Sequence, residues 1–259
     1  LLFIAMMLAC LALQIATNLF NEYYDFKRGL DTADSVGIGG GIVRHGLKPK
    51  NVLTVAILLY IVAALIGVYI CMSSSWWLAV IGLFGMAVGY LYTGGPLPIA
   101  YTPFGELFSG LLMGTCFVLI AFFIQTNTLT VESILISIPI GILVGAINMS
   151  NNIRDIEEDI KGGRKTLAIL LGRDKAVAAL AIAFIISYLW IVAIVLMGYV
   201  SPWALVLFLG LKKPISAIQS FQKGAKEPQY MREAMKSTAM TNTIFGFLLA
   251  AGLLISYLF

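Results

Sequence analysis

Two polar stripes with the same spacing interrupt an otherwise apolar chain. In each stripe the steps between polar residues are four, three and four positions, which places all of them on one face of an α-helix. Each stripe ends in carboxylates where its apolar segment becomes charged, and acids at the rim of a membrane helix indicate a working site. The stripes consist of Gln14, Asn18, Asn21 and Asp25, and of Asn148, Asn152, Asp155 and Asp159.

The oxygen atoms of these stripes suit a hard cation. Mg²⁺ favours one or two carboxylates together with phosphate oxygens and water, so two acidic edges could hold a diphosphate through metal ions. Asp31 extends the first stripe, beyond Gly29, where a helix is expected to end. The predicted metal-binding residues are Asn21, Asp25, Asp31, Asp155 and Asp159.

Basic side chains near the second stripe could neutralise the remaining phosphate charge. They are Arg154, Lys161, Arg164 and Lys165, and Arg44 is a further candidate. The alternative for one stripe alone is a solvated helix end with ordinary salt bridges. Two equal stripes favour a binding site.

The elements that carry the stripes are predicted to be membrane helices. The chain is 60% hydrophobic and 12% charged, with a mean hydropathy of +0.94, values that a soluble domain rarely reaches. Apolar runs of about 20 residues recur, each long enough to cross a bilayer. We predict eight spans, at 1–24, 51–72, 76–93, 104–124, 132–153, 176–198, 202–220 and 238–258.

The seventh predicted span is the weakest, because Lys212 and Lys213 cut it short. The matched stripes lie in the first and fifth spans, which favours two halves of four helices. Glycines predict close helix packing in two spans: Gly82, Gly85 and Gly89 in the third, and Gly141 and Gly145 in the fifth.

The distribution of Lys and Arg predicts the topology. Eight spans leave seven loops, and all 17 Lys and Arg fall in odd-numbered loops, at 25–50, 154–175 and 212–237. By the positive-inside rule these loops face the cytoplasm, as do the acidic ends of both stripes. The net charge of +4 fits membrane orientation and does not indicate a nucleic-acid partner. We expect a multi-pass protein of the cell membrane with its site on the cytoplasmic face.

We predict an all-α, polytopic helix bundle that forms one membrane-embedded domain over residues 1–259. The chain begins inside an apolar run without an initiator Met. We therefore expect that one N-terminal helix is missing, which would make nine in the full chain.

The ordered motifs resemble those of the UbiA superfamily of intramembrane prenyltransferases, and in detail its menaquinone branch. The resemblance rests on the pattern from Asn21 to Asp31, on Asp155-x-x-x-Asp159, and on three further stretches, 92–101, Gly105-Glu106 and 165–172. It covers most of the chain. Glu22 departs from the pattern, because many relatives carry Asp there. The loop motif of the hydroxybenzoate branch is absent.

The resemblance implies an Mg²⁺-dependent transfer of a polyprenyl group from its diphosphate to 1,4-dihydroxy-2-naphthoate, which gives demethylmenaquinone, diphosphate and CO₂. Asn21, Asp25, Asp155 and Asp159 would be the catalytic residues. The lipid bilayer would hold the prenyl tail.

Several residues are candidates for substrate contacts. Aromatic rings can stabilise an allylic cation. Tyr92 and Tyr101 are candidates for this role, and the alternative is that they belong to the aromatic belt at the membrane interface. Glu106 could orient the acceptor, act as a base, or serve as a structural helix charge. Asn152 is a candidate substrate contact, and Asn18 and Asn148 either contact the acceptor or pair inside the bundle.

Two alternatives remain open from the sequence. One is a sister prenyltransferase with another aromatic acceptor, such as homogentisate or a porphyrin-type ring. The other is an ion-coupled transporter that uses the acids as a cation site. Transporters usually bind their substrates and coupling ions near the bilayer midplane, whereas these acids lie at predicted helix ends.

Overall fold

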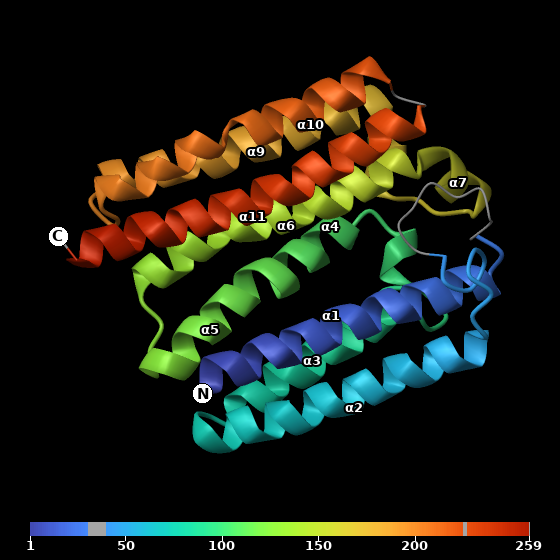
Figure 1. The fold of residues 1–259 in the computed structure, drawn as a ribbon, viewed down its shortest axis with the longest axis horizontal. Coiled ribbons are helices and arrows are strands. Elements are labelled where there is room, and N and C mark those ends of the chain that lie inside the picture. Colours follow the sequence, from blue (N-terminus) through green and yellow to red (C-terminus); the bar gives the residue numbers. More distant parts are fainter. Residues whose placement is uncertain (31–39, 225–226, 259) are drawn as a thin grey trace. The chain divides into compact units, whose positions relative to one another are not determined.

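The computed structural model describes residues 1–30, 40–224 and 227–258, and these residues form helices with no strand (Figure 1). The prediction of an all-α chain is confirmed. The elements are α1 (Leu2–Lys27), α2 (Pro49–Ser73), α3 (Trp77–Leu91), η1 (Ile99–Tyr101), α4 (Gly105–Ser109), η2 (Gly110–Cys116), α5 (Phe117–Thr126), α6 (Val131–Arg154), α7 (Ile156–Lys161), α8 (Leu167–Leu171), α9 (Arg173–Leu196), η3 (Pro202–Gly210), α10 (Lys212–Lys223) and α11 (Pro228–Leu258).

In the part of the chain that the structure describes, seven helical segments are long and apolar enough to cross a membrane. They agree with seven of the eight predicted spans. The shorter apolar helix α3, of 15 residues, occupies the position of the remaining one. The membrane segments are Leu2–Lys27, Pro49–Ser73, Gly105–Thr126, Val131–Arg154, Arg173–Leu196, Pro202–Lys223 and Pro228–Leu258.

The expectation that Lys212 and Lys213 cut the seventh span short is wrong, because the apolar segment continues to Lys223. The 3₁₀ segment η3 leads through Leu211 into α10, which begins at Lys212. Lys212 is exposed, whereas Ala217 and Phe221 on the other face of α10 are buried. The apolar face packs while the lysine head reaches solvent, so the charge does not end the helix.

Two predicted loops also contain helices. The short helices α7 and α8 lie within the predicted loop 154–175, and α8 begins where the Thr166 side chain accepts a hydrogen bond from the Ile169 amide. Helix α11 begins at Pro228, well before the predicted start at 238. Proline at a helix start has no amide to leave unpaired, which favours this boundary.

The chain divides into two compact units. Unit 1 comprises Leu1–Thr102, Ile120–Leu129 and Lys161–Arg164. Unit 2 comprises Pro103–Leu119, Thr130–Ile160 and Lys165–Phe259. The first stripe lies in unit 1 and the second in unit 2.

In unit 1, helices α1, α2 and α3 pack side by side (Figure 1). Ala16 and Ala56 are fully buried, which lets α1 and α2 approach closely. Phe20 makes edge-to-face contacts with Tyr60, at a centroid distance of 5.0 Å, and with Tyr90, at 5.5 Å. This aromatic cluster lies one turn before the polar end of α1 and holds that end against its neighbours.

Unit 2 has the larger core, which is formed by α6, α9, η3, α10 and α11. Its fully buried side chains include Leu143 on α6, Leu180 on α9 and Phe245 on α11. Helix α6, which carries Asn148 and Asn152 of the second stripe, therefore packs on several sides.

Glycines bring η2 close to α6. A Cβ at Gly114 would lie 2.5 Å from the Gly141 Cα, and a Cβ at Gly110 would lie 2.5 Å from the Gly141 carbonyl oxygen. A Cβ at Gly145 would lie 2.9 Å from the Glu106 carbonyl oxygen. The predicted close packing at Gly141 and Gly145 is confirmed. In α3 the same prediction is confirmed at Gly89, where an added Cβ would lie 2.6 Å from the Tyr60 hydroxyl oxygen of α2. It is wrong for Gly82 and Gly85, where an added Cβ would meet no described atom within 4 Å.

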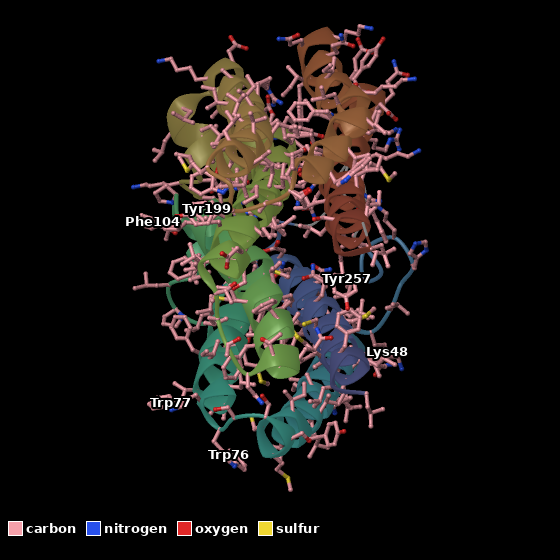
Figure 2. The ribbon with its side chains drawn as sticks, turned by 90° about the vertical axis from the view of Figure 1, so that its left-hand side faces the viewer. Lys48, Trp76, Trp77, Phe104, Tyr199 and Tyr257 are labelled. Atoms are coloured by element: carbon pink, nitrogen blue, oxygen red, sulfur yellow. The ribbon has the colours of Figure 1, made fainter. Side chains whose placement is uncertain are left out.

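Exposed aromatic side chains lie at loops that carry no Lys or Arg. In unit 1, Trp76 caps the start of α3 and Trp77 is its first residue. They are 61% and 77% exposed, and both project away from the helices (Figure 2). In unit 2, Tyr199 follows α9 and Trp203 begins η3, and both are exposed. Aromatic rings of this kind collect where a bilayer meets water.

Candidate functional site

The first stripe lies on one continuous helix, as predicted. Helix α1 extends through Lys27, so Gln14, Asn18, Asn21 and Asp25 share a face. Gln14 and Asn18 are exposed, whereas Asn21 and Asp25 are partly buried. Asp31 lies outside the described residues, and its predicted role as a metal ligand stays a prediction.

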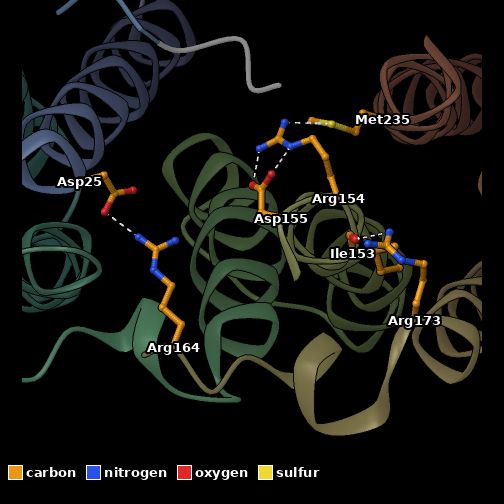
Figure 3. Close-up of polar contacts among 7 residues, drawn as sticks. All are labelled: Asp25, Ile153, Arg154, Asp155, Arg164, Arg173 and Met235. Atoms are coloured by element: carbon orange, nitrogen blue, oxygen red, sulfur yellow. Dashed lines mark hydrogen bonds and ion pairs between the residues drawn. The ribbon is translucent and has the colours of Figure 1, made fainter. Parts of the chain in front are cut away.

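Asn21 and Asp25, the last two residues of the first stripe, have defined partners in unit 1. The Asn21 Oδ1 accepts a 2.7 Å hydrogen bond from the hydroxyl of Thr93, which is 2% exposed. The Asp25 Oδ1 accepts a 2.6 Å hydrogen bond from Arg164 Nη2, and the two side chains point toward each other (Figure 3). The prediction grouped Arg164 with the second stripe, which lies close in sequence; the structure pairs it with the first.

Arg28 is a functional candidate that sequence reasoning missed. Its guanidinium donates hydrogen bonds to the carbonyl oxygens of Thr93 and Gly95, the latter at 3.2 Å. It also lies over the rings of Tyr24, at 5.4 Å, and Tyr101, at 5.5 Å. The available signal was its position three residues after Asp25, at the C-cap of α1.

Tyr101 therefore lies close to two cations, because the Arg164 guanidinium is 5.4 Å from its ring centroid. The segment from Tyr92 to Tyr101 is closed by a 2.9 Å hydrogen bond from the Ala100 amide to the Tyr92 carbonyl oxygen. The ends of this segment are thus held near the polar end of α1. The arrangement gathers two guanidinium groups and a carboxylate within unit 1, a set that can bind a phosphorylated ligand and its metal.

Glu22, the departure from the family pattern, has a structural role. Its Oε1 accepts a 2.7 Å hydrogen bond from the Ile42 amide. It therefore links α1 to the segment that follows the residues outside the described part. Arg44, a predicted phosphate contact, is exposed in this segment and packs its side chain over Gly40.

The second stripe crosses a break between two helices, which the prediction did not include. Helix α6 ends at Arg154, Asp155 caps it at φ −94° and ψ 8°, and α7 carries Asp159. The Asp159 amide still donates to the Asp155 carbonyl oxygen at 2.8 Å, so the two aspartates remain one turn apart. Asp159 is only 4% exposed.

Asp155 forms a two-point ion pair with its neighbour Arg154. The Nε–Oδ1 and Nη2–Oδ2 distances are both 2.5 Å. The third nitrogen, Nη1, contacts the Met235 sulfur of α11 at 2.9 Å (Figure 3). Arg154 is thereby anchored between two helices of unit 2, with its charge directed at the stripe.

Asn148 and Asn152, the first two residues of the second stripe, lie on α6 and are partly buried. Asn152 Nδ2 donates a 2.7 Å hydrogen bond to Glu106 Oε1, so α4 adds a carboxylate to this face of unit 2. Asn148 lies one turn earlier on α6. Lys161 is exposed at the end of α7.

Arg173 was also missed, and its role is structural. It donates to the Ile153 carbonyl oxygen at 2.7 Å (Figure 3). It also donates to Glu157 Oε2 at 2.6 Å. The Ile153 carbonyl belongs to the last turn of α6, whose carbonyls lack helical partners, and a cation there stabilises the helix end. This contact holds the position at which Asp155 leaves α6.

The donor chemistry fits Mg²⁺ bound together with a phosphorylated ligand. Among the described residues, no three His, Cys, Asp or Glu side chains gather into a metal cage. Mg²⁺ that is shared with a diphosphate needs only one or two carboxylates, because phosphate oxygens and water complete its coordination. Asp25 and Asp155 each offer one carboxylate that an arginine now neutralises.

Comparisons with known proteins identify the family and the relatives to which this chain is similar. The UbiA prenyltransferase family model matches residues 1–232. The 1,4-dihydroxy-2-naphthoate octaprenyltransferase of Bacillus subtilis (strain 168) is 68% identical over 257 residues, which cover 99% of this chain and 82% of that protein. The Haemophilus influenzae protein of the same name is 28% identical, over 96% of this chain and 82% of its own length.

Solved structures share the fold. The apo structure of a UbiA homolog from Aeropyrum pernix K1 aligns with a TM-score of 0.68 at 15% identity and covers 98% of this chain and 89% of that one. A UbiA homolog from Archaeoglobus fulgidus, bound to DMAPP and Mg²⁺, aligns with a TM-score of 0.63 at 13% identity, over 96% and 88% of the two chains. Because the family model matches residues 1–232, this chain belongs to the UbiA prenyltransferase family.

Proposed function

We propose that this chain transfers a polyprenyl group from polyprenyl diphosphate to 1,4-dihydroxy-2-naphthoate, as a step of menaquinone synthesis. The observation that carries the proposal is the 68% identity, over 99% of this chain, to a protein named for that reaction. The acidic stripes, the arginines beside them and the apolar spans supply the chemistry that such a reaction needs.

In this proposal, Asp25 of the first stripe and Asp155 and Asp159 of the second bind the diphosphate through Mg²⁺, and Asn21 adds an amide oxygen. Bound Mg²⁺ would stabilise the negative charge that grows on the leaving diphosphate. A homologue of the same fold has been solved with DMAPP and Mg²⁺, which supports this cofactor for the family.

The arginines have two roles in succession. Without substrate, Arg164 and Arg154 neutralise Asp25 and Asp155. When the diphosphate binds, these guanidinium groups turn to its oxygens and stabilise the leaving group electrostatically. The carboxylates are then available to the metal.

The organic step is balanced without an oxidant. The bond from the prenyl carbon to the diphosphate oxygen breaks, and the electron-rich ring attacks the allylic carbon. Loss of the ring carboxylate as CO₂ returns its electron pair to the ring. The product therefore leaves as demethylmenaquinol, the reduced form of demethylmenaquinone. Tyr92 and Tyr101 are the aromatic rings we assign to stabilising the cation.

We further propose that the site faces the cytoplasm of the cell membrane. The proposal rests on the placement of all 17 Lys and Arg in three of the predicted loops, on the side where both stripes end. The long tail can then remain in the bilayer while the diphosphate reaches water.

The test is mass spectrometry of products from purified protein. The protein is incubated with 1,4-dihydroxy-2-naphthoate, a mixture of prenyl diphosphates and Mg²⁺, with EDTA as the control. We expect prenylated, decarboxylated naphthohydroquinones only with Mg²⁺. Products from homogentisate instead would identify a sister enzyme, and ion-dependent solute uptake into liposomes without any product would identify a transporter.

Arg28→Ala is expected to lower kcat/KM by about 10- to 100-fold, because the segment from Tyr92 to Tyr101 loses its link to α1 and small misplacements of a site are costly. Arg28→Lys should restore part of the activity, since lysine keeps the charge but not the two-point geometry. The exposed neighbour Lys27 supplies the control, Lys27→Ala, which should retain wild-type rates. Equal rates for Arg28→Ala and wild type would show that this contact does not matter for catalysis.

A further inference from the structure

Unit 2 contains an apolar cavity of about 380 Å³ between the α4–η2 segment, α6 and α9. Its walls are mainly aliphatic side chains and the glycines at which η2 meets α6. Of the described residues that line it, only Glu106 and Thr115 have polar side chains, and none is Lys or Arg. Its volume lies within the range of small-molecule sites, roughly 300–1,000 Å³.

Glu106 is only half satisfied by its surroundings. Oε1 accepts the 2.7 Å hydrogen bond from Asn152. Oε2 is buried and has no hydrogen-bond partner among the described residues. A carboxylate oxygen buried without a donor is costly, so a ligand hydroxyl at this point would be stabilised.

The charge of the cavity selects among the ligands of the proposed reaction. Diphosphate and the naphthoate carboxylate are anions, which Glu106 repels and which no lining cation attracts. A decarboxylated, prenylated hydroquinone is uncharged, offers two hydroxyl donors and carries an aliphatic chain. It matches both the unpartnered acceptor and the apolar walls.

We propose that this cavity binds the prenylated hydroquinone, with one hydroxyl donating to Glu106 Oε2 and the first isoprene units against α6 and α9. This proposal rests on the proposed function for the identity of the hydroquinone. Asn152 joins Glu106 to the second stripe, so product bound here adjoins the Asp155 end of unit 2 and slows the next turnover as a product inhibitor.

The redox state of the ligand gives a direct test, because a hydroquinone donates hydrogen bonds and the corresponding quinone does not. Full-length protein in nanodiscs of zwitterionic lipid is titrated with 2-geranyl-1,4-naphthohydroquinone, kept reduced, and with its quinone. We expect the wild type to bind the hydroquinone about 10-fold more tightly or better, as one hydrogen bond to a charged group allows. Equal affinity for the two forms, or binding of neither, would overturn the proposal.

Two substitutions of Glu106 test whether this residue causes the preference for the hydroquinone over the quinone. Glu106→Gln places an amide that can donate to a quinone carbonyl, so the preference should vanish or invert. Glu106→Leu should remove it altogether. Glu132→Gln, at an exposed acid on the other end of α6, should leave the preference intact. If Glu106→Gln still preferred the hydroquinone as strongly as the wild type does, Glu106 would not be the acceptor.

A cavity-filling variant keeps the test independent of hydrogen bonding. Ala183→Phe fills the cavity from α9 and should weaken binding of both redox forms by about 10-fold or more, with an unchanged unfolding temperature as the fold check. If Glu106→Gln instead raises the KM for 1,4-dihydroxy-2-naphthoate while the redox preference persists, the cavity binds the acceptor and the proposal fails. Failure of the proposed function appears separately, as absence of prenylated product from wild-type protein.

Discussion

Asp159→Asn is expected to lower prenyl transfer by about 10³-fold or more, because in the proposed mechanism its carboxylate would hold the Mg²⁺ that stabilises the charge growing on the leaving diphosphate. The same loss is expected for Asp25→Asn. Asparagine preserves the size of each side chain, which matters for Asp159, since it is only 4% exposed. The measurement is the initial rate in detergent or vesicles over a range of Mg²⁺ concentrations.

The matched control is Glu158→Gln, which removes an exposed carboxylate next to Asp159. It should retain nearly full activity, because the Glu158 side chain is exposed to solvent, whereas Asp159 is buried. Both aspartate variants should insert and elute as the wild type does. Full Mg²⁺-dependent turnover in Asp159→Asn and in Asp25→Asn would exclude the shared metal–diphosphate role.

Gly252→Ala is expected to destabilise the protein by about 3 kcal/mol, the upper part of the usual range for overpacking. A Cβ at this position of α11 would lie 2.4 Å from the Trp203 carbonyl oxygen and 2.9 Å from the Ala204 Cα. These are backbone atoms of η3, which cannot move aside as a flexible side chain can. Thermal unfolding followed by circular dichroism should show a midpoint lower by about 10 °C.

Gly246→Ala is the control on the same helix, since its added Cβ would meet no described atom within 4 Å. This variant should unfold at the wild-type temperature or slightly above it, because alanine favours helix more than glycine does. Equal unfolding temperatures for Gly252→Ala and Gly246→Ala would show that α11 and η3 do not require the close approach.

The membrane spans were predictable because they depend on local sequence. A run of about 20 apolar residues specifies a spanning helix whatever surrounds it. The ends of the spans were less predictable. Lys212 lies inside the Pro202–Lys223 segment, because the buried face of α10 outweighs one charge that can reach solvent.

The candidate site was predictable along each helix and not between helices. Helical spacing alone placed Asn21 and Asp25 on one face, since a fixed rise and rotation relate residues within a turn. It did not reveal that Asp155 ends α6, because a helix end depends on capping and on contacts such as that between Arg173 and the Ile153 carbonyl.

The sequence by itself determined the spans, the two polar faces and the segregation of basic residues, all of which follow from residue type and periodicity. The tertiary structure decided which groups pair. Arg164 contacts Asp25 at a separation of 139 residues, and Asn152 contacts Glu106 at a separation of 46. Such pairs form because packing brings distant backbone segments together and buried charges must find partners there, and no local pattern records the choice.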